Sequence, residues 1–241
     1  MAANKPKPKT QVEQKVHPWR PCALGKHWVS AHTRNRISSK GNPYTQSVGG
    51  YCRTNPSHQD HLYKDDIYEV SENHFSKLSG PPAANELTFK GIGNKYDHLI
   101  RGWTRYWNDV LQPSDLLDPD LIKALIASES SFNPNAYNGL KGDNAARGLM
   151  QVLNKSVQLL KNSKELRDHF VNLDEDDMKD PNLTICAGIR WLFRKKQILE
   201  SRRKQKVSWR DAVADYKGVK PDEKKLMPRF DSYYNALKGI K

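Results

Sequence analysis

The amino-acid sequence predicts a mainly α-helical protein, with a helical domain over residues 96–241 behind a small irregular module at residues 21–95. From Tyr96 onward, apolar side chains recur at steps of three and four residues, which is the period of an amphipathic helix. The same half contains two Asp-Pro pairs, 118–119 and 180–181, that are typical helix starts. Residues 21–95 are rich in Gly, Asn, Ser, His and Tyr, so we expect an α+β or loop-rich module there.

The composition suits one large or two small domains and favours an anionic partner. The chain has 241 residues and a formal net charge of +13, which suits nucleic acid, an anionic membrane surface or the bacterial cell wall. The basic residues are interspersed and form no nucleic-acid-binding motif, so we expect no nucleic-acid partner. No apolar run approaches the roughly 18 residues of a membrane-spanning helix, so we expect no membrane span.

The chain divides into three predicted parts. Residues 1–20 form a basic tail, in which alternating Lys and Pro favour an extended, solvated backbone. In the module at 21–95, short strands such as 27–33 are expected between turn signals at 41–43 and 49–50. A Gly-Pro-rich stretch near residue 80 is typical of a linker, so we expect residues 96–241 to fold without the module.

The module contains a set of cysteine and histidine side chains whose role the spacing leaves open. These residues are Cys22, His27, His32, Cys52, His58 and His61. Thiolate and imidazole are zinc ligands, but the spacings match no zinc signature. A structural zinc site, a Cys22–Cys52 disulfide and unlinked side chains therefore all remain possible. The third cysteine, Cys186, lies among apolar residues and is expected in the core.

Four helices are expected in the second half of the chain. The first begins near Tyr96, and its aromatic stripe is interpreted as core packing. The second covers residues 120–132 behind the cap Asp118, and the third follows Asp180-Pro181. The fourth has a capping box over residues 208–211 and a stop signal at Gly218.

Glu129 is the strongest candidate for a catalytic side chain. It follows Leu121 and Leu125 at steps of four residues, so it lies on the apolar face of the second helix. A carboxyl group in an apolar setting has a raised pKa, which is the property of a general acid near neutral pH. The alternative is a glutamate at a helix end that faces solvent or pairs with a nearby Lys or Arg.

Four segments together resemble the lysozyme-like lytic transglycosylases and their relatives, the goose-type lysozymes. The segments, in order, are Glu129-Ser130, Gly148-Leu149-Met150-Gln151, Asn182-Leu183 with Ala187-Gly188-Ile189-Arg190-Trp191-Leu192, and Ala212-Val213-Ala214-Asp215-Tyr216. In that family, a glutamate followed by serine closes a helix and the Gly-Leu-Met-Gln segment crosses the substrate cleft. The resemblance covers about residues 96–241 and implies a lysozyme-like helical fold.

The resemblance also implies an activity, the cleavage of the β-1,4 bond between N-acetylmuramic acid and N-acetylglucosamine in peptidoglycan. Glu129 would act as acid and then as base, with no cofactor needed for this chemistry. The side chains expected to shape the sugar subsites are Ser130, Tyr137, Met150, Gln151 and Tyr216. The alternative is an inactive protein that keeps the fold and binds the cell wall or another polyanion through its basic surface.

Departures from the family pattern bear on the reaction. Eighteen residues separate Glu129 from Gly148, and they include Asp143, near where goose-type enzymes carry a carboxylate thought to position water. Leu153 occupies a position that is often acidic there, and Lys217-Gly218 replaces the usual Asn-Ala-Gly. A second carboxylate would allow hydrolysis, whereas without one the sugar's own groups give a 1,6-anhydro product. Asp143 therefore favours hydrolysis by a narrow margin.

The expected place of action follows from the expected substrate. The basic N-terminus is followed by no apolar segment, so it is not a secretory signal peptide. We expect a protein made in the cytoplasm that acts in the periplasm or cell wall of a target bacterium. Delivery by a phage lysis system or an antibacterial secretion machine would make a secretion component or a cognate immunity protein its partner.

Overall fold

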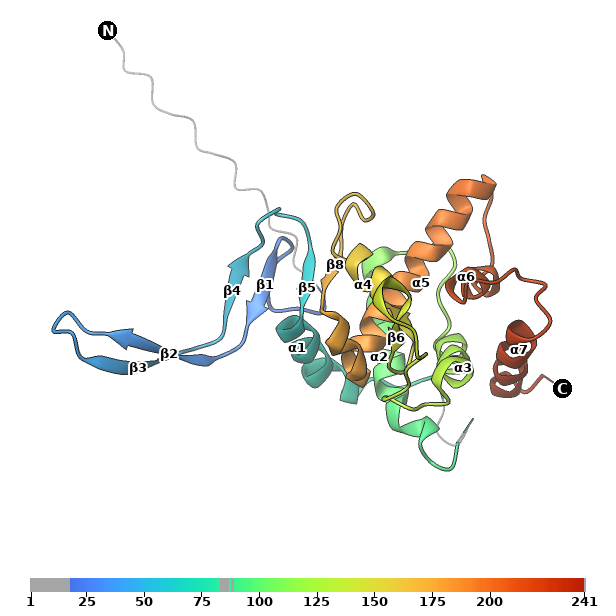
Figure 1. The fold of residues 1–241 in the computed structure, drawn as a ribbon, viewed down its shortest axis with the longest axis horizontal. Helices are drawn as coiled ribbons and strands as arrows, with labels where there is room; N and C mark the ends of the chain where they lie inside the picture. Colours follow the sequence, from blue (N-terminus) through green and yellow to red (C-terminus); the bar gives the residue numbers. More distant parts are fainter. Residues whose placement is uncertain (1–17, 83–86, 88, 241) are drawn as a thin grey trace, which may run out of the picture.

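The computed structural model describes residues 18–82, 87 and 89–240, which form a helical body with a projecting two-stranded arm (Figure 1). The α-helices of these residues are α1 (Lys64–His74), α2 (Asp97–Leu111), α3 (Pro119–Ser130), α4 (Asn154–Leu159), α5 (Pro181–Arg203), α6 (Trp209–Tyr216) and α7 (Leu226–Leu237). Short 3₁₀ turns lie at Phe75–Lys77, Gly93–Tyr96, Gly142–Asn144 and Glu175–Lys179. The predicted mainly α fold is therefore confirmed.

The strands of the described residues form four two-stranded pairs. In the N-terminal part, β1 (Lys26–Val29) pairs with β4 (Tyr51–Thr54), and β2 (His32–Ile37) pairs with β3 (Pro43–Val48), both antiparallel. The predicted turns at 41–43 and 49–50 lie at the arm's tip and between β3 and β4. In the body, β5 (His61–Tyr63) runs parallel to β8 (Phe170–Asn172), and β6 (Ala146–Arg147) pairs with β7 (Val152–Leu153).

Helix α5 is the central element of the body. It packs against α1, α2 and α6, and apolar side chains are buried around most of its circumference. The predicted start is confirmed: the Asp180 carboxylate accepts hydrogen bonds from the backbone N–H groups of Asn182 and Leu183 at 2.8 and 3.1 Å. Cys186 is completely buried in this helix, as expected.

The aromatic stripe of α2 lies in the core rather than on a ligand surface. Trp103, Tyr106 and Trp107 are completely buried. The two indole N–H groups donate to the Asn182 side chain at 2.7 Å and to the Cys186 carbonyl at 3.0 Å, both on α5. These bonds satisfy polar groups that would otherwise be costly to bury, so they fix α2 against α5.

Helix α3 carries the candidate glutamate in its last turn. Asp118 caps its start by accepting a hydrogen bond from the Asp120 N–H at 2.9 Å, and Pro119 is the first helical residue. The helix ends at Ser130, two residues earlier than predicted, because Ser131 and Phe132 adopt left-handed backbone angles of φ 53° and 61°. The chain therefore turns sharply just after Glu129.

The hydrophobic core crosses the predicted boundary between residues 95 and 96. Leu62, Ile67, Val70 and Phe75 are buried in the same core as α2, α3 and α5. Arg101 on α2 also donates to the carbonyls of Leu78, Gly80 and Pro82, so the expected linker is fastened to the body. The expectation that residues 96–241 fold without the preceding segment thus loses its basis.

The predicted tail at 1–20 also ends differently from the expectation. Residues 1–17 lie outside the described part of the chain, but Trp19 and Arg20 are buried. The Trp19 indole donates to Asp109 of α2 at 3.0 Å, and Arg20 forms ion pairs with Asp60 and Asp66. Both residues therefore belong to the folded body.

The structure joins Cys22 to Cys52 in a disulfide, one of the three alternatives left open. This bond occupies both thiols. His27 contacts the Asn55 side chain at 2.7 Å, and His61 contacts Ser57 and Asn172. Across the described residues, no group of three or more His, Cys, Asp or Glu side chains is placed to hold a metal ion. The helices described here also include none long and apolar enough to cross a membrane.

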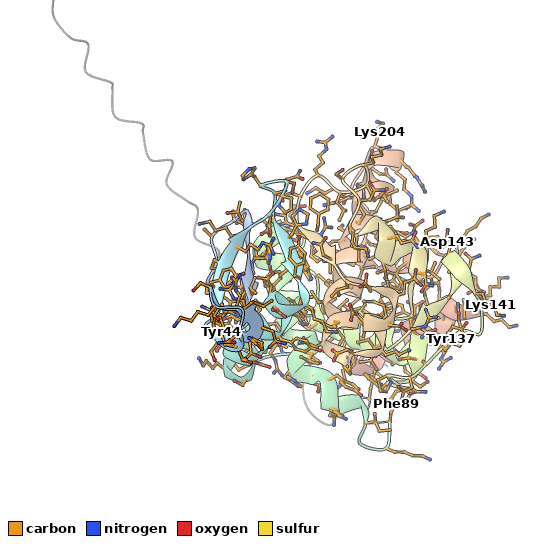
Figure 2. All side chains as sticks on the ribbon, turned by 60° about the vertical axis from the view of Figure 1, so that its left-hand side comes forward. Tyr44, Phe89, Tyr137, Lys141, Asp143 and Lys204 are labelled. Carbon is orange, nitrogen blue, oxygen red and sulfur yellow. A yellow bond between two sulfur atoms is a disulfide. The ribbon has the colours of Figure 1, made fainter. Side chains whose placement is uncertain are left out.

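Figure 2, in which the arm comes forward, marks Tyr44 on the arm, whereas Lys204 at the end of α5 and Asp143 belong to the body. The candidate site is built entirely from the body.

Candidate functional site

Glu129 and Lys217 form an ion pair between the ends of two helices. Glu129 is in the last turn of α3, and Lys217 directly follows α6. The Lys217 Nζ atom lies 2.5 Å from the Glu129 Oε1 atom and donates to the Ser128 hydroxyl at 3.0 Å. The Lys217 side chain is only 4% exposed and that of Glu129 is 18% exposed. The alternative noted for Glu129, a pairing with a nearby cation, thus describes its resting contact.

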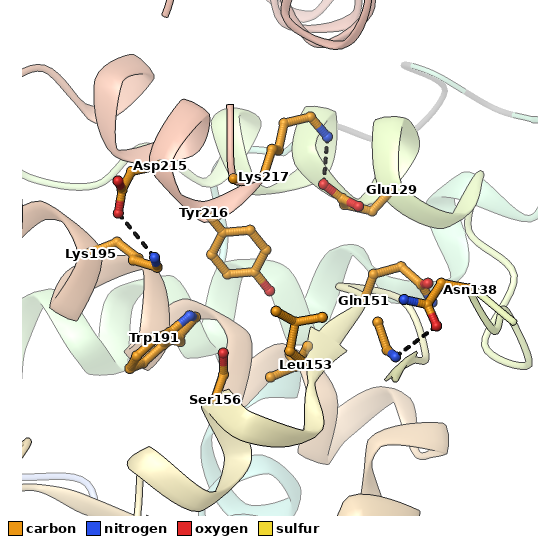
Figure 3. Close-up of a pocket in the computed structure, with 13 residues that line it drawn as sticks. Glu129, Asn138, Gln151, Leu153, Ser156, Trp191, Lys195, Asp215, Tyr216 and Lys217 are labelled. Atoms are coloured by element: carbon orange, nitrogen blue, oxygen red, sulfur yellow. Dashed lines mark hydrogen bonds and ion pairs between the residues drawn. The ribbon is translucent and has the colours of Figure 1, made fainter. Parts of the chain in front are cut away.

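This ion pair borders a cavity of about 250 Å³ (Figure 3). Its lining residues are Glu129, Asn138, Ala146, Gln151, Val152, Leu153, Ser156, Trp191, Lys195, Asp215, Tyr216, Lys217 and Gly218. They come from α3, α4, α5, α6 with the two residues after it, and the segment 138–153 that includes β6 and β7. The lining combines apolar surfaces with a few polar groups, which is typical of a site for a small organic ligand.

A second cavity, of about 480 Å³, shares part of that lining. The shared residues are Glu129, Asn138, Gln151 and Lys217, and the second cavity continues past Ser130, Tyr137 and Arg229. The carboxyl group of Glu129 therefore lies where two cavities meet. A larger cavity of about 590 Å³ lies between residues 164–169 and α5, but it contains none of the predicted site residues.

The Gly148–Gln151 segment crosses the site in a tight turn. Gly148 has φ +76°, and a Cβ atom there would lie 1.8 Å from the Met178 carbonyl oxygen, so only glycine fits. The Gln151 side-chain nitrogen donates to the carbonyls of Ala136 and Gly148 at 3.0 and 2.9 Å. Within the described residues, these bonds leave its amide oxygen as the group able to accept a hydrogen bond from a ligand.

Met150 does not line either cavity, contrary to the predicted role in substrate binding. Its side chain is completely buried and packs against Gly188 of α5, where a Cβ atom would lie 2.5 Å from the Met150 sulfur. The absence of a side chain at Gly188 therefore leaves the space that the Met150 side chain fills. The backbone carbonyl of Met150 has a separate role, because it accepts a hydrogen bond from Tyr216.

The structure brings Tyr216 to the wall of the first cavity. Its hydroxyl donates to the Met150 carbonyl at 2.8 Å rather than to Glu129. Burial, and then the negative charge of Glu129, raise the pKa of Tyr216 well above its usual range. The hydroxyl therefore stays protonated and holds α6 against the Gly148–Gln151 segment.

Ser130 and Tyr137 line the second cavity with Glu129. The Ser130 hydroxyl donates to the Ile126 carbonyl one turn earlier at 3.2 Å. Tyr137 is half exposed, its hydroxyl donates to the Leu140 carbonyl, and the Arg147 guanidinium lies 5.3 Å from the centre of its ring. These two predicted residues thus reach the site from opposite sides of the turn that ends α3.

Asp143 does not line the cavities that contain Glu129. It is exposed in the 3₁₀ turn at Gly142–Asn144. The position that is often acidic in goose-type enzymes, Leu153, does line the first cavity and is apolar. The structure therefore offers no support for a water-positioning role of Asp143, because its carboxylate is outside the site.

Several lining residues were not identified from the sequence. Asp215 pairs with Lys195 at 3.0 Å, which adds a second ion pair to the first cavity, and Lys195 also lies over the Trp191 ring. Lys195 follows Trp191 by four residues on α5, so this pair was a readable helix-face signal. Asp215 and Lys217 flank Tyr216, and Lys217 reaches the site because the end of α6 lies beside the end of α3, which no local pattern predicts.

The family comparison supports this location of the site. Residues 110–225 match the family described as the transglycosylase SLT domain, a range that includes Glu129, the Gly148–Gln151 segment and Tyr216. This part of the chain belongs to the SLT domain family. The SLT domain so matched begins at the end of α2 and stops before α7, although the core extends beyond both limits.

Among solved structures, the chain is similar to the 70 kDa soluble lytic transglycosylase SLT70 from Escherichia coli. The sequence identity is 15%, the TM-score is 0.32, and the match covers 75% of this chain and 32% of that chain. The chain therefore spans about a third of the length of that enzyme. A search of curated proteins gives no significant match.

Proposed function

We propose that the SLT domain cleaves the β-1,4 bond between N-acetylmuramic acid and N-acetylglucosamine in peptidoglycan, with Glu129 as the acid and then the base. The observation that carries the proposal is the position of Glu129 at the junction of two cavities. A glycan strand that fills both cavities has a glycosidic oxygen near this carboxyl group. The membership of residues 110–225 in the SLT family supports the substrate class.

The proposed reaction uses no water. Glu129 donates a proton to the glycosidic oxygen, and the bond from that oxygen to the anomeric carbon of N-acetylmuramic acid breaks. The C6 oxygen of the same sugar then bonds to the anomeric carbon and its proton passes to Glu129, which gives a 1,6-anhydro end. In the resting site the carboxyl group of Glu129 is paired with Lys217, so this contact must be released for Glu129 to reach the glycosidic oxygen.

We propose a 1,6-anhydro product in place of the hydrolysis that the sequence favoured narrowly. Hydrolysis with inversion needs a second carboxylate placed to activate a water molecule. Asp143 lies outside the cavities, and Asp215, which lines the first cavity, is already paired with Lys195. The sugar's own hydroxyl is therefore the nucleophile that the site favours.

Two variants and their products test this proposal. Glu129→Gln keeps the shape and removes the transferable proton, so release of soluble fragments from purified sacculi should fall by about 10²–10⁴-fold. Asp143→Asn is the matched control and should remain near wild type. Mass spectrometry should show fragments with ends one water lighter than reducing ends. More than a tenth of the activity in Glu129→Gln would contradict the assignment, and reducing ends would instead indicate hydrolysis, with Asp215 the carboxylate to test.

One observation favours a second candidate function. Lys217 holds the Glu129 carboxyl group at 2.5 Å, and this ion pair can stay intact in a protein that binds glycan strands without cleaving them. The same assay separates the two functions. If wild-type protein binds sacculi but releases no more fragments than Glu129→Gln, the binding function replaces the catalytic one.

We also propose that the enzyme acts outside the cytoplasm, in the periplasm or cell wall, and lyses the bacterium it reaches. The Cys22–Cys52 disulfide supports this place of action, because disulfides persist in oxidising compartments. Production in Escherichia coli with an added secretion signal should lyse the cells, whereas production without it, or with Glu129→Gln, should not. Equal survival of all three cultures would refute the bacteriolytic role. If the secreted protein does lyse the cells, we expect a bacterium that produces it to carry an immunity protein that protects its own wall.

A further inference from the structure

The arm formed by residues 32–48 is a ribbon of two strands that projects from the helical body (Figure 1). All six residues of β2 are exposed, and so are four of the six in β3. Ile37 and Tyr44 are 75% and 49% exposed, so neither side chain is buried against the body. An isolated two-stranded ribbon is only marginally stable, so this one has the features of a surface that serves a partner.

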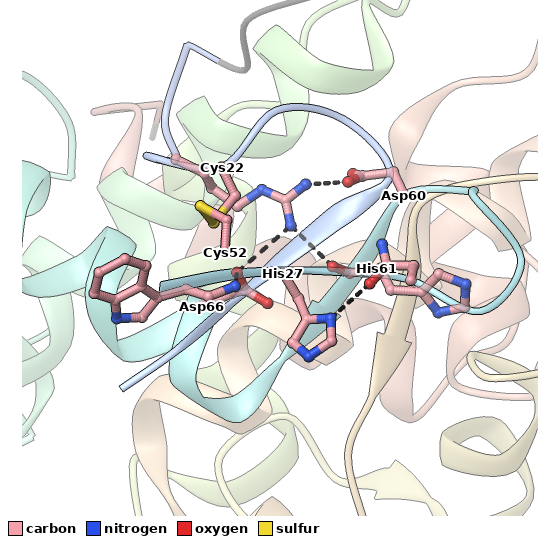
Figure 4. The surroundings of a disulfide bond; sticks show 9 residues. Cys22, His27, Cys52, Asp60, His61 and Asp66 are labelled. Carbon is pink, nitrogen blue, oxygen red and sulfur yellow. Dashed lines mark hydrogen bonds and ion pairs between the residues drawn. A yellow bond between two sulfur atoms is a disulfide. The ribbon is translucent and has the colours of Figure 1, made fainter. Parts of the chain in front are cut away.

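The β1–β4 pair, from which the arm extends, is fixed to the body around the Cys22–Cys52 disulfide (Figure 4). The Cys22–Cys52 disulfide ties β4 to the segment before β1. The carboxylates of Asp66 and Asp65 at the start of α1 accept hydrogen bonds from the N–H groups of Trp28 and Ser30 at 2.7 and 2.9 Å. The β1–β4 pair at the base of the arm is thereby fastened to α1, and α1 belongs to the core.

The charged side chains of the arm lie on one face. Residues opposite each other in the register share a face, so Arg34 lies beside Gln46 and Arg36 beside Tyr44. The Arg34 Nε atom donates to the Gln46 side chain at 2.9 Å, in agreement with this assignment. The other face carries Thr33, Asn35, Ile37, Pro43, Thr45 and Ser47, all uncharged. Lys40 adds a cation in the turn at the tip.

Acidic residues are absent from the arm and the segments on either side of it. Between residues 21 and 59 the sequence contains no Asp or Glu, while Lys26, Arg34, Arg36, Lys40 and Arg53 are all cationic. A ribbon face with two arginines and no counter-charge attracts anionic groups, and guanidinium binds carboxylates through two parallel hydrogen bonds. Six residues of strand reach about 20 Å. The cavities around Glu129 are lined by no residue of the arm.

We propose that this face of the arm binds the stem-peptide carboxylates of peptidoglycan and holds the SLT domain on the wall. The inference rests on the proposed function for its choice of polyanion. The arm would contact peptides outside the cleft, because it projects from the body and none of its residues lines the cavities around Glu129. Its contribution would be to retention on the insoluble wall and not to cleavage of the bond itself.

Co-sedimentation with purified sacculi tests the arm without cleavage, in full-length protein that also carries Glu129→Gln. The arm variant has Arg34→Gln, Arg36→Gln and Lys40→Gln. The matched control has Arg202→Gln, Lys204→Gln and Lys206→Gln, which removes the same charge from exposed residues at the end of α5. We expect the arm variant to bind sacculi about tenfold more weakly than the Glu129→Gln parent, and the control variant less than about twofold more weakly. Both variants should unfold at the same temperature as that parent.

Chemical amidation of the sacculi identifies the anionic group. Amidation removes the stem-peptide carboxylates, so the difference between the arm variant and the control should disappear. Equal loss in the two variants, or an arm effect that survives amidation, would overturn the proposal. So would arm-dependent binding to double-stranded DNA or anionic vesicles that exceeds binding to sacculi.

The two proposals fail separately. If binding depends on the arm but the wild-type enzyme releases no fragments, the proposed catalysis is refuted and the proposed binding by the arm stands. If fragments are released but binding does not depend on the arm, the proposed catalysis stands and the proposed binding by the arm is refuted.

Discussion

The side chains of Glu129 and Lys217 depend on each other, because each supplies the counter-charge of the other in a partly closed site. Lys217 is 4% exposed, so an uncharged residue at position 129 leaves a buried ammonium group without its ionic partner. The substitution that tests catalysis therefore also affects stability. A loss of activity in Glu129→Gln counts only when the variant is shown to be folded under the assay conditions.

We predict an energetic coupling between these two residues. In a double-mutant cycle of Glu129→Gln and Lys217→Met, the coupling should be about 1–3 kcal/mol in the free energy of unfolding, measured by urea denaturation. The pair of Asp176 and Lys179 is the control, because both side chains are more than half exposed at a similar separation, and its coupling should lie within experimental error. Additive effects at 129 and 217 would show that the ion pair contributes nothing measurable.

Single residues differ in how much of their role is visible in the sequence. Asp118 and Asp180 were predicted as caps because a cap acts on residues two or three positions ahead. Glu129 was predicted from its own helix and a motif. Its partner Lys217 is 88 positions away, and no local pattern predicts which helix ends face each other. For the same reason, Met150 was assigned to the cavity although its side chain points into the core.

At the scale of elements, the site depends on how tightly the Gly148–Gln151 segment is held between α5 and the turn at residues 175–179. Gly148 touches the Met178 carbonyl, and Met150 packs on Gly188. The Tyr216 hydroxyl ties α6 to the same segment. The second, third and fourth family motifs therefore form one packing unit.

Gly148→Ala tests this packing against a matched glycine. Gly139 in the same region also has a positive φ, +78°, but a Cβ atom there would have no neighbour within 4 Å. Gly139→Ala should lower the free energy of unfolding by about 1–2 kcal/mol through backbone strain alone. Gly148→Ala should cost at least about 2 kcal/mol more, because a backbone carbonyl must move, and should reduce sacculus cleavage. Equal urea midpoints for the two variants would disprove the packing argument.

At the scale of the whole molecule, the helical body extends across more of the chain than either the helical periodicity or the SLT match covers. The matched range ends before α7, yet Met227 and Phe230 of that helix are completely buried. At the other end, β5 pairs in parallel with β8, more than 100 residues away. Long-range pairings of this kind leave no periodic signal. The sequence therefore predicted α2, α3, α5 and α6, but not α1, α4, α7 or the N-terminal limit of the body.

The arm and the segment that follows it differ in how they relate to this body. Residues 32–48 are mostly exposed, whereas Leu62, Ile67, Val70 and Phe75 fill the core. The module predicted at residues 21–95 therefore contains a peripheral part and an integral part. Only the peripheral part is expected to be dispensable for folding.

A chain shortened to residues 92–241 should consequently fail to fold cooperatively. It lacks Trp19, Leu62, Ile67, Val70 and Phe75, each of which contributes about 1.5–3 kcal/mol when buried. Their sum is comparable to the whole stability of a typical domain, about 5–15 kcal/mol. Phe75 in particular covers Gly102 and meets the Trp103 ring edge-on at 5.0 Å, so its loss exposes the centre of α2.

The control for this truncation is a full-length protein in which residues 33–47 are replaced by Asn-Gly, a pair that suits a two-residue hairpin turn. This variant keeps the disulfide and the contacts of Asp65 and Asp66, so its urea midpoint should match that of the wild type, and it should still release fragments from sacculi. The fragment 92–241 should give no cooperative transition in near-ultraviolet circular dichroism and no cleavage. If fragment 92–241 is instead soluble, cooperative and active, then α2, α3, α5 and α7 form a complete core by themselves. In that case α1 and β5 pack on this core without being needed for it to fold.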